Sequence, residues 1–176
     1  LSLRRQRQMC IRDRDEFPDL EPRIVENQTE ELLLRLRDGQ IDVAVLATPT
    51  DATGVCEIPL YDEAFAIVTS PDHPAAGRGD LDLNALKDLE LLLLDDGHCL
   101  RDQIVELCKI AEVNRTPGAQ SVTRAASLTT VVQLVVAGLG STLVPVSALS
   151  TECARPGLAI AAFGPGVDAK RTVGLV

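Results

Sequence analysis

Segments with the character of strands alternate with amphipathic segments of helical length in this chain, and this alternation constrains its fold most. Residues 29–38 carry apolar side chains at helical spacing, with Thr29 in a position to cap the helix and Gly39 after its end. Residues 21–26 before this helix and residues 41–47 after it are predicted strands, the second mostly apolar as in a parallel sheet. This order predicts a right-handed β-α-β crossover unit and an α/β fold.

The rest of the chain continues in the same way. Further strands are predicted at residues 58–61, 64–69, 89–94, 119–123, 142–144, 158–163 and 171–176, with helices at 84–88, 101–113 and 127–137 and a loop at 71–79. These elements predict two α/β lobes, with the chain crossing between them near residues 64–68 and returning near residues 164–170. The first lobe is predicted to hold residues 15–66 plus 168–176, and the second lobe residues 67–167.

Charge is unevenly distributed along the chain. The net charge is −9, but residues 1–14 contain five arginines and one aspartate, which leaves 12 basic and 25 acidic side chains in the rest. A body this acidic repels a phosphate backbone, which argues against direct nucleic-acid binding by it. The basic head has two open interpretations, a nucleic-acid-binding tail or a non-native segment such as translated adapter sequence. Its lack of apolar periodicity and its abrupt junction with globular sequence favour the second.

The five cysteines, at positions 10, 56, 99, 108 and 153, form an odd set without paired spacings. No C-x-x-C is present, and His73 and His98 do not lie at zinc-finger spacing from a cysteine, so we expect neither a metal nor another cofactor. The longest apolar run, at residues 89–94, is far shorter than the roughly 20 residues of a membrane span, and the sequence has no secretory signal. These features predict a cytoplasmic protein with free thiols and no membrane association.

The sequence Gly-His-Cys-Leu-Arg-Asp-Gln at residues 97–103 carries the strongest chemical signal. Cys99 lies where a predicted loop gives way to a helix, and the free amides and dipole of a helix start favour the thiolate. Arg101, and His98 when protonated, favour it further, while Asp102 opposes it but offers an acceptor for a hydrogen bond from a peroxide. Since a thiolate is the nucleophile that attacks a peroxide O–O bond, this segment indicates redox chemistry.

Cys108 follows Cys99 by nine residues. If the segment between them is helical, nine steps of about 100° place the two sulfurs on opposite faces, about 13.5 Å apart along the axis. A disulfide needs Cα atoms within about 7 Å, so oxidation would have to remodel this segment, as a switch requires. Two interpretations stay open on these residues alone, a redox pair or a buried structural cysteine in an apolar helix. Cys56 and Cys153 have no supporting neighbours and are interpreted as structural.

Residues 96–103, Asp-Gly-His-Cys-Leu-Arg-Asp-Gln, followed by Cys108, closely resemble the redox loop of the OxyR family, the hydrogen-peroxide sensors among the LysR-type transcription regulators. The resemblance covers nearly all of residues 15–176 and is also carried by residues 17–21, 28–33, 36–45, 127–128, 136–145 and 171–175. Those other motifs indicate only the LysR superfamily, whereas the loop with its second cysteine is much more specific. The resemblance implies an α/β, two-lobed regulatory domain of the periplasmic-binding-protein-like (LysR substrate-binding) type, truncated at both ends.

By this resemblance Cys99 is the peroxide-reactive cysteine, and Cys108 resolves its sulfenic acid into a disulfide. The resemblance also implies a peroxide-binding set made of Thr29, Gly97, His98, Asp102 and Arg171. Each has a plainer interpretation when it is taken alone: the threonine as a simple helix cap, the arginine as a surface charge and the histidine as an ordinary surface residue.

The implied function is redox sensing for a DNA-binding transcription regulator rather than enzymatic turnover. The expected partners are hydrogen peroxide, further copies in a homodimer or homotetramer, a thiol reductant that resets the protein, and DNA and RNA polymerase through the intact protein only. Three alternatives remain. The first is a LysR-type domain that binds a small organic effector between its lobes. The second is a thiol peroxidase, although no Pro-x-x-x-Thr-x-x-Cys motif precedes either thiol, and the third is a solute-binding protein, which would need a secretion signal.

Overall fold

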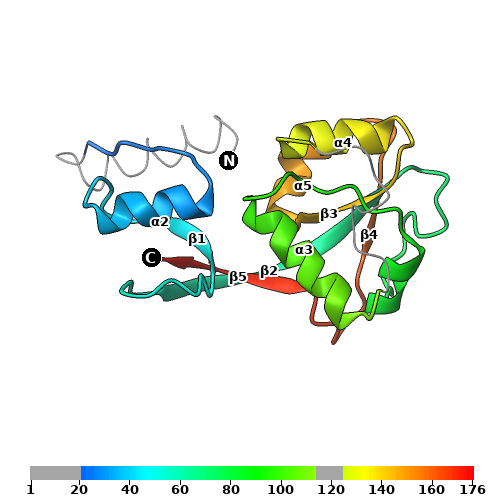
Figure 1. The fold of residues 1–176 in the computed structure, drawn as a ribbon. Helices are drawn as coiled ribbons and strands as arrows, with labels where there is room; N and C mark the ends of the chain where they lie inside the picture. Colours follow the sequence, from blue (N-terminus) through cyan, green and yellow to red (C-terminus); the bar gives the residue numbers. More distant parts are fainter. Residues whose placement is uncertain (1–20, 114–124) are drawn as a thin grey trace.

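The computed structural model describes residues 21–113 and 125–176, so the head at residues 1–14 and the strand predicted at residues 119–123 lie outside the described residues. The helices are α2 (Thr29–Arg37), α3 (Cys99–Ile110), α4 (Leu128–Val136) and α5 (Val146–Glu152), with a 3₁₀ helix, η1, at Leu83–Asp88. The strands are β1 (Val45–Thr48), β2 (Ile58–Thr69), β3 (Thr142–Pro145), β4 (Ala159–Ala162) and β5 (Lys170–Leu175). Figure 1 shows these elements arranged in two lobes that β2 and β5 connect.

The long strand β2 belongs to the sheets of both lobes. Its residues 58–64 pair with β5, which pairs in turn with β1, and these three strands form the sheet of the first lobe. Its residues 65–69 pair with β3 and with β4 to form the sheet of the second lobe. All four pairings are antiparallel. The chain therefore passes between the lobes at residues 64–65, within the segment where the sequence predicts a crossing.

Each lobe has its own hydrophobic core. The core of the second lobe takes buried side chains from β2, β3, α3 and α4, and Ile104 of α3 is only 2% exposed within it. Burying an aliphatic side chain of this size contributes roughly 1.5–3 kcal/mol, so α3 is fastened to the second lobe mainly by this face. The first lobe has a smaller cluster around α2 and β1, made of Leu33, Ala44, Leu46 and Val176.

The predicted β-α-β crossover unit is wrong. Residues 21–26 are exposed and irregular, and β1 is short and antiparallel to β5 instead of parallel to an earlier strand. The apolar character of residues 41–47 indicated a strand covered on both faces, yet Val43 and Val45 are more than half exposed. The first lobe instead builds its sheet from β1 and the two strands that cross between the lobes.

Two other strand predictions need correction. The strands predicted at residues 58–61 and 64–69 are one continuous strand, β2. Residues 89–94 form no regular strand and make isolated parallel bridges to Ser141 and to Ala125. Their apolar composition reflects burial in the core, which a strand and an irregular buried segment satisfy equally well.

The helix predictions are largely confirmed. The helix predicted at residues 101–113 begins earlier, at Cys99, and ends at Ile110. The Ser127 hydroxyl accepts a hydrogen bond from the backbone N–H of Thr130 and caps α4, as predicted. The sequence did not predict α5, which begins directly after Pro145. None of the helices in residues 21–113 and 125–176 is long and apolar enough to cross a membrane.

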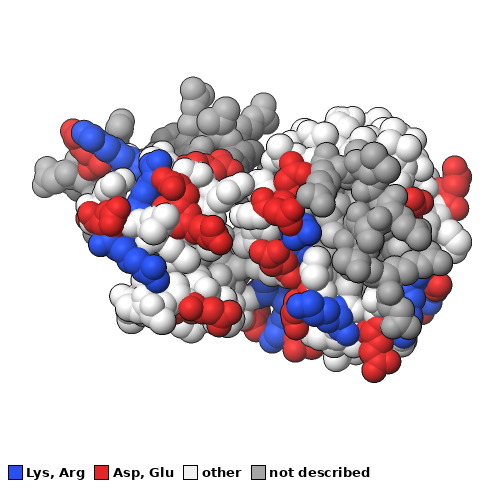
Figure 2. Space-filling view, in the orientation of Figure 1, with Lys and Arg blue, Asp and Glu red and all other residues white. Residues whose placement is uncertain are grey.

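The acidic excess of the chain is visible on its surface. On the face shown in Figure 2, acidic side chains are spread over both lobes with basic side chains between them. Such a mixed surface offers the described part of this face no continuous basic patch for a phosphate backbone.

Candidate functional site

Helix α3 presents Cys99 at its first position. His98 holds the N-cap position without a side-chain capping bond, and Gly97 before it has a φ of +90°. Cys99 is half-buried, while Leu100 and Ile104 on the same helix are buried in the core. Because the first amides of a helix lack partners within the helix, negative charge is favoured at this point.

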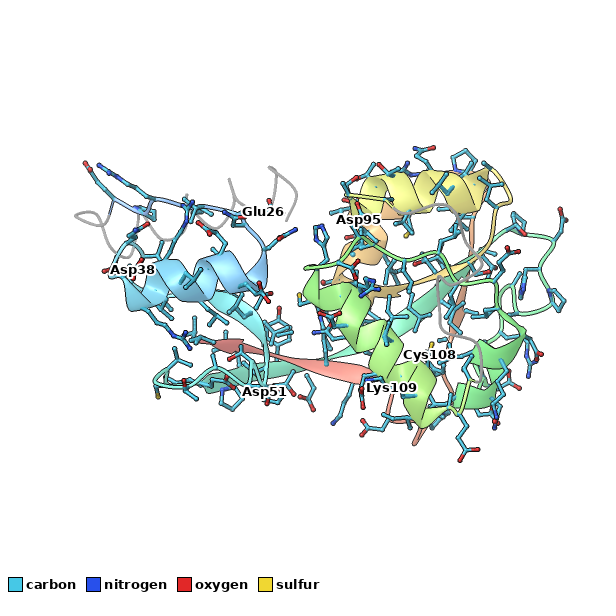
Figure 3. All side chains as sticks on the ribbon, viewed as in Figure 1. Glu26, Asp38, Asp51, Asp95, Cys108 and Lys109 are labelled. Atoms are coloured by element: carbon cyan, nitrogen blue, oxygen red, sulfur yellow. The ribbon has the colours of Figure 1, made fainter. Side chains whose placement is uncertain are left out.

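The start of α3 faces the start of α2 on the other lobe. The labels of Glu26 and Asp38 in Figure 3 lie close to the two ends of α2, and its N-terminal end is the one nearer the second lobe. A Cβ atom at Gly97 would lie 2.9 Å from Oε1 of Gln28, so the two lobes touch here. Since Gln28 directly precedes Thr29, the contact brings the first turn of α2 next to the loop that carries Cys99.

The prediction that Thr29 caps α2 is wrong. Gln28 occupies the N-cap position, and its side chain makes no capping hydrogen bond. Thr29 is instead the first helical residue and is half-buried beside the contact between the lobes. The plainer interpretation of this threonine, a simple helix cap, therefore does not hold.

Arg101 forms ion pairs with two carboxylates around Cys99. Its Nη1 lies 2.7 Å from Oδ1 of Asp96 and 3.5 Å from Oδ1 of Asp102, and its side chain is 27% exposed. Partly exposed pairs of this kind contribute roughly 0–1 kcal/mol each, so they order the loop more than they stabilise the fold. Both carboxylates lie close enough to Arg101 to offset its charge within the loop.

Cys108 lies in the last turn of α3 and is 1% exposed within the core of the second lobe. Figure 3 labels it near the end of α3 that lies away from the first lobe. Burial raises the pKa of the Cys108 thiol to about 11. The predicted helix between the cysteines is confirmed, so their Cα atoms are about 13.5 Å apart along the axis, roughly twice the reach of a disulfide.

The other two described cysteines lie elsewhere. Cys56 is exposed and Cys153 is buried, and both are free thiols. Burial raises the pKa of the Cys153 thiol, with a further contribution from the charge of Glu152. Within residues 21–113 and 125–176, no group of three or more histidines, cysteines and acidic residues is placed to hold a metal ion.

Arg171 lies on β5 directly opposite Glu63 of β2, at the junction of the lobes. Its Nε donates to Oε2 of Glu63 at 2.9 Å, and its Nη2 lies 2.8 Å from the same oxygen. Oε1 of Glu63 accepts from the backbone N–H of Ser147 at 2.9 Å. Burial raises the pKa of Glu63, but the hydrogen bonds from Ser147 and Arg171 outweigh it and hold the pKa below its usual value. The arginine is therefore bound to a buried carboxylate at the lobe junction, so the interpretation as a plain surface charge is wrong.

Gln103 was not selected from the sequence, although it lies four residues after Cys99 and so on the same face of α3. Its Oε1 atom is buried and has no hydrogen-bond partner among the described residues. A buried acceptor without a partner costs about 1–3 kcal/mol, and a small donor molecule at this point would satisfy it. The signal that could have found it is the i, i+4 spacing from the cysteine within the seven-residue motif.

Gly97→Ala tests the contact between the lobes. The substitution should lower the free energy of unfolding by about 1–3 kcal/mol, because a left-handed φ is strained for alanine and its Cβ meets Gln28. Denaturant unfolding measures this loss. Gly77→Ala is the matched control, since Gly77 has a φ of +73° but open space around it. A loss no larger than that of the control would show that Gln28 does not constrain position 97.

The buried thiol of Cys108 should make stability depend on pH. The pKa of Cys108 in the folded protein is about 11, above the ordinary value of 9.0. The protonated thiol therefore contributes its full share to the free energy of unfolding below pH 9, and this contribution is lost as the pH rises toward 11. The slope reaches about 1.4 kcal/mol per pH unit in that interval. Urea unfolding at several pH values measures it, with Cys108→Ala as the control that lacks the titration. Equal slopes for the two proteins would contradict the burial of this thiol.

Residues 11–176 match the family model of the LysR substrate binding domain. The chain therefore belongs to the LysR family. It is 47% identical over 159 residues to the "Probable hydrogen peroxide-inducible genes activator" of Mycobacterium avium, and the match covers 90% of this chain and 50% of that protein. It is 39% identical over 163 residues to the "DNA-binding transcriptional dual regulator OxyR" of Escherichia coli, covering 91% of this chain and 51% of that one. The chain thus spans about half the length of these curated relatives.

Solved structures of OxyR proteins resemble the fold closely. A hydrogen-peroxide-bound mutant of Corynebacterium glutamicum OxyR is 61% identical, with a TM-score of 0.92, covering 96% of this chain and 52% of its own. The oxidised form of the same OxyR gives a TM-score of 0.80 at 60% identity, and the match covers 97% of this chain and 52% of that one. A reduced form of OxyR gives a TM-score of 0.80 at 34% identity, and the match covers 96% of this chain and 76% of that one. The predicted two-lobed LysR fold and the resemblance to the OxyR family are confirmed.

Proposed function

We propose that this chain is the redox-sensing regulatory part of a LysR-type DNA-binding transcription regulator, which hydrogen peroxide oxidises to a Cys99–Cys108 disulfide. One observation carries the proposal. A single helix begins at a half-buried cysteine beside the contact between the lobes and buries a second cysteine in its last turn. The similarity to OxyR proteins in peroxide-bound, oxidised and reduced forms supports it.

The chemistry proceeds in two balanced steps. The Cys99 thiolate attacks one peroxide oxygen, the O–O bond breaks, and hydroxide leaves to be protonated to water, so that a sulfenic acid forms on Cys99. The Cys108 thiol then gives up its proton and its sulfur attacks the sulfenic sulfur, which releases a second water. Two thiols are oxidised and one peroxide is reduced to two waters. Because Cys108 is buried in α3, the second step requires that helix to open.

The peroxide-binding residues proposed for this site are Thr29, Gly97, His98, Asp102 and Arg171. Thr29 and Gly97 approach from opposite lobes at the point where Gln28 meets the loop, which supports a site that both lobes build. Gln103 joins the set, because its buried Oε1 has no partner in residues 21–113 and 125–176, lies one helical turn from Cys99 and suits the O–H of a peroxide.

The lobes of the regulator are assigned to residues 15–66 plus 168–176 and to residues 67–167. The change of partners along β2 at residues 64–65 supports a division between the lobes within two residues of the first boundary. In the whole protein the regulator is no enzyme: it acts as a homodimer or homotetramer, binds DNA and RNA polymerase through segments outside this chain, and is reset by a thiol reductant. The names of the relatives, which are activators of hydrogen-peroxide-inducible genes and a DNA-binding regulator, support this assignment.

Cys108→Ser tests the resolving step. In the variant, Cys99 should still oxidise, but its sulfenic acid should persist or over-oxidise because no thiol on the helix can condense with it. Mass spectrometry of peptides from peroxide-treated protein is the measurement, and the wild type should show a disulfide between Cys99 and Cys108.

The same measurement separates the alternatives. A wild-type disulfide that pairs Cys99 with Cys153 would refute the assigned resolving cysteine. No loss of thiols after stoichiometric peroxide would favour a domain that binds a small organic effector and has inert cysteines. Continuous peroxide consumption with a reductant at enzymatic rates would favour a thiol peroxidase.

A further inference from the structure

We propose that Glu63 is a positioning residue for the reaction of Cys99 with hydrogen peroxide, because its carboxylate holds the guanidinium of Arg171 in one orientation at the lobe junction. The inference rests on the proposed function, in which Arg171 binds peroxide. It assigns a role to a buried acidic residue that neither the motif nor the redox chemistry includes.

The ion pair leaves part of the guanidinium available. A guanidinium has five N–H donors in a planar fork, and Arg171 turns two of them, on Nε and Nη2, toward the single atom Oε2 of Glu63. Its Nη1 group takes no part in this pair. The side chain of Arg171 is 20% exposed, and its guanidinium is held along the edge that carries Nε and Nη2.

Glu63 is itself held in place from a third element. Its Oε1 accepts the backbone N–H of Ser147 in the first turn of α5, and its side chain is only 5% exposed. The backbones of β2 and β5 also pair at Glu63 and Arg171. A long arginine side chain loses its rotamer freedom in such a setting. Binding of peroxide therefore does not carry the entropy cost of ordering this side chain.

The residue before Glu63 in β2 provides a matched comparison. Asp62 pairs with Lys170 of β5 at 2.7 Å and also accepts from the Thr172 hydroxyl, so it too joins the crossing strands by an ion pair. Its side chain, however, is 51% exposed, and neighbouring residues of a strand point to opposite faces of a sheet. Loss of either charge weakens a link between β2 and β5, but only loss of Glu63 releases Arg171.

The experiment compares Glu63→Gln, Arg171→Ala, their double variant and Asp62→Asn in the full-length protein. For each we measure the rate at which Cys99 is oxidised by hydrogen peroxide and, by peptide mapping, the rate at which it is alkylated by iodoacetamide. Glu63→Gln should slow the peroxide reaction about 10- to 100-fold and leave alkylation unchanged, because alkylation does not use Arg171. Asp62→Asn should leave both rates unchanged, and Glu63→Gln should add no further loss to Arg171→Ala.

Three results would overturn the inference. Glu63→Gln could behave like Asp62→Asn, or it could lower the peroxide and alkylation rates equally. In the third, the double variant reacts with peroxide more slowly than Arg171→Ala by the same factor that Glu63→Gln causes alone. If Glu63→Gln does not fold, Glu63→Asp replaces it, since an aspartate cannot reach both partners, and a wild-type rate in that variant overturns the inference. Failure of the proposed function looks different. In that case Cys99 of the wild type reacts with peroxide no faster than an ordinary thiol, and Arg171→Ala changes nothing.

Discussion

Cys99→Ser is expected to abolish rapid peroxide oxidation, with a loss on the order of 100-fold or more in sulfenic-acid formation. Cys108 cannot replace the missing thiol. With a pKa of about 11 it is a thiolate in only about one molecule in 10⁴ at pH 7, and it is 1% exposed. Trapping of sulfenic acid with a dimedone-type reagent, quantified at the peptide level, measures the effect.

Cys56→Ser is the matched control for this prediction. Cys56 is an exposed free thiol in a loop of the first lobe, so its loss removes a cysteine without touching α3. In this variant, sulfenic acid should be trapped at the wild-type rate. Equal trapping in Cys99→Ser and the wild type would show that Cys99 is not the reactive cysteine.

The second large effect is expected in α3 itself. Formation of the Cys99–Cys108 disulfide should abolish most hydrogen-exchange protection across residues 99–110, because the bond cannot form within an intact helix. Opening the helix also withdraws Ile104 and Leu107 from the core, which removes the packing that holds it. Exchange measured by mass spectrometry on reduced and oxidised protein tests this expectation.

Peroxide-treated Cys108→Ser separates disulfide formation from oxidation alone. This variant acquires the sulfenic acid but cannot form the bond, so α3 should keep the protection of the reduced protein. Unchanged protection in oxidised wild type that carries the disulfide would mean that the bond forms without remodelling, and the proposed switch would fail.

The features that the sequence predicts well are those with local causes. Helix α4 is specified by its own apolar spacing and by Ser127, which caps it from within the same segment. The two cysteines of α3 lie on one short helix whose apolar residues repeat at helical spacing, so their separation follows from the helical rise alone. Fold class and the reactive segment were therefore accessible without the structure.

The features that the sequence does not predict depend on distant partners. The antiparallel pairing of β1 with β5 joins Val45 to Leu175, and neither segment contains a signal for that direction. Glu63 finds Arg171 and Ser147 at separations of 108 and 84 residues. The contact between Gln28 and Gly97 is of the same kind. A buried acidic residue in a strand gives no indication of which cation will meet it until the strands are placed side by side.

The sharing of β2 between two sheets has a consequence for the order in which the protein assembles. The described strands of the second lobe, including residues 65–69 of β2, are synthesised before Lys170, so this lobe and α3 can pack while the chain is still emerging from the ribosome. The first lobe must wait for β5, whose side-chain bonds to β2 span 108 to 110 positions, and contacts that distant form slowly. We therefore expect the helix with both thiols to form early, and the contact of Gln28 with its loop to form among the last.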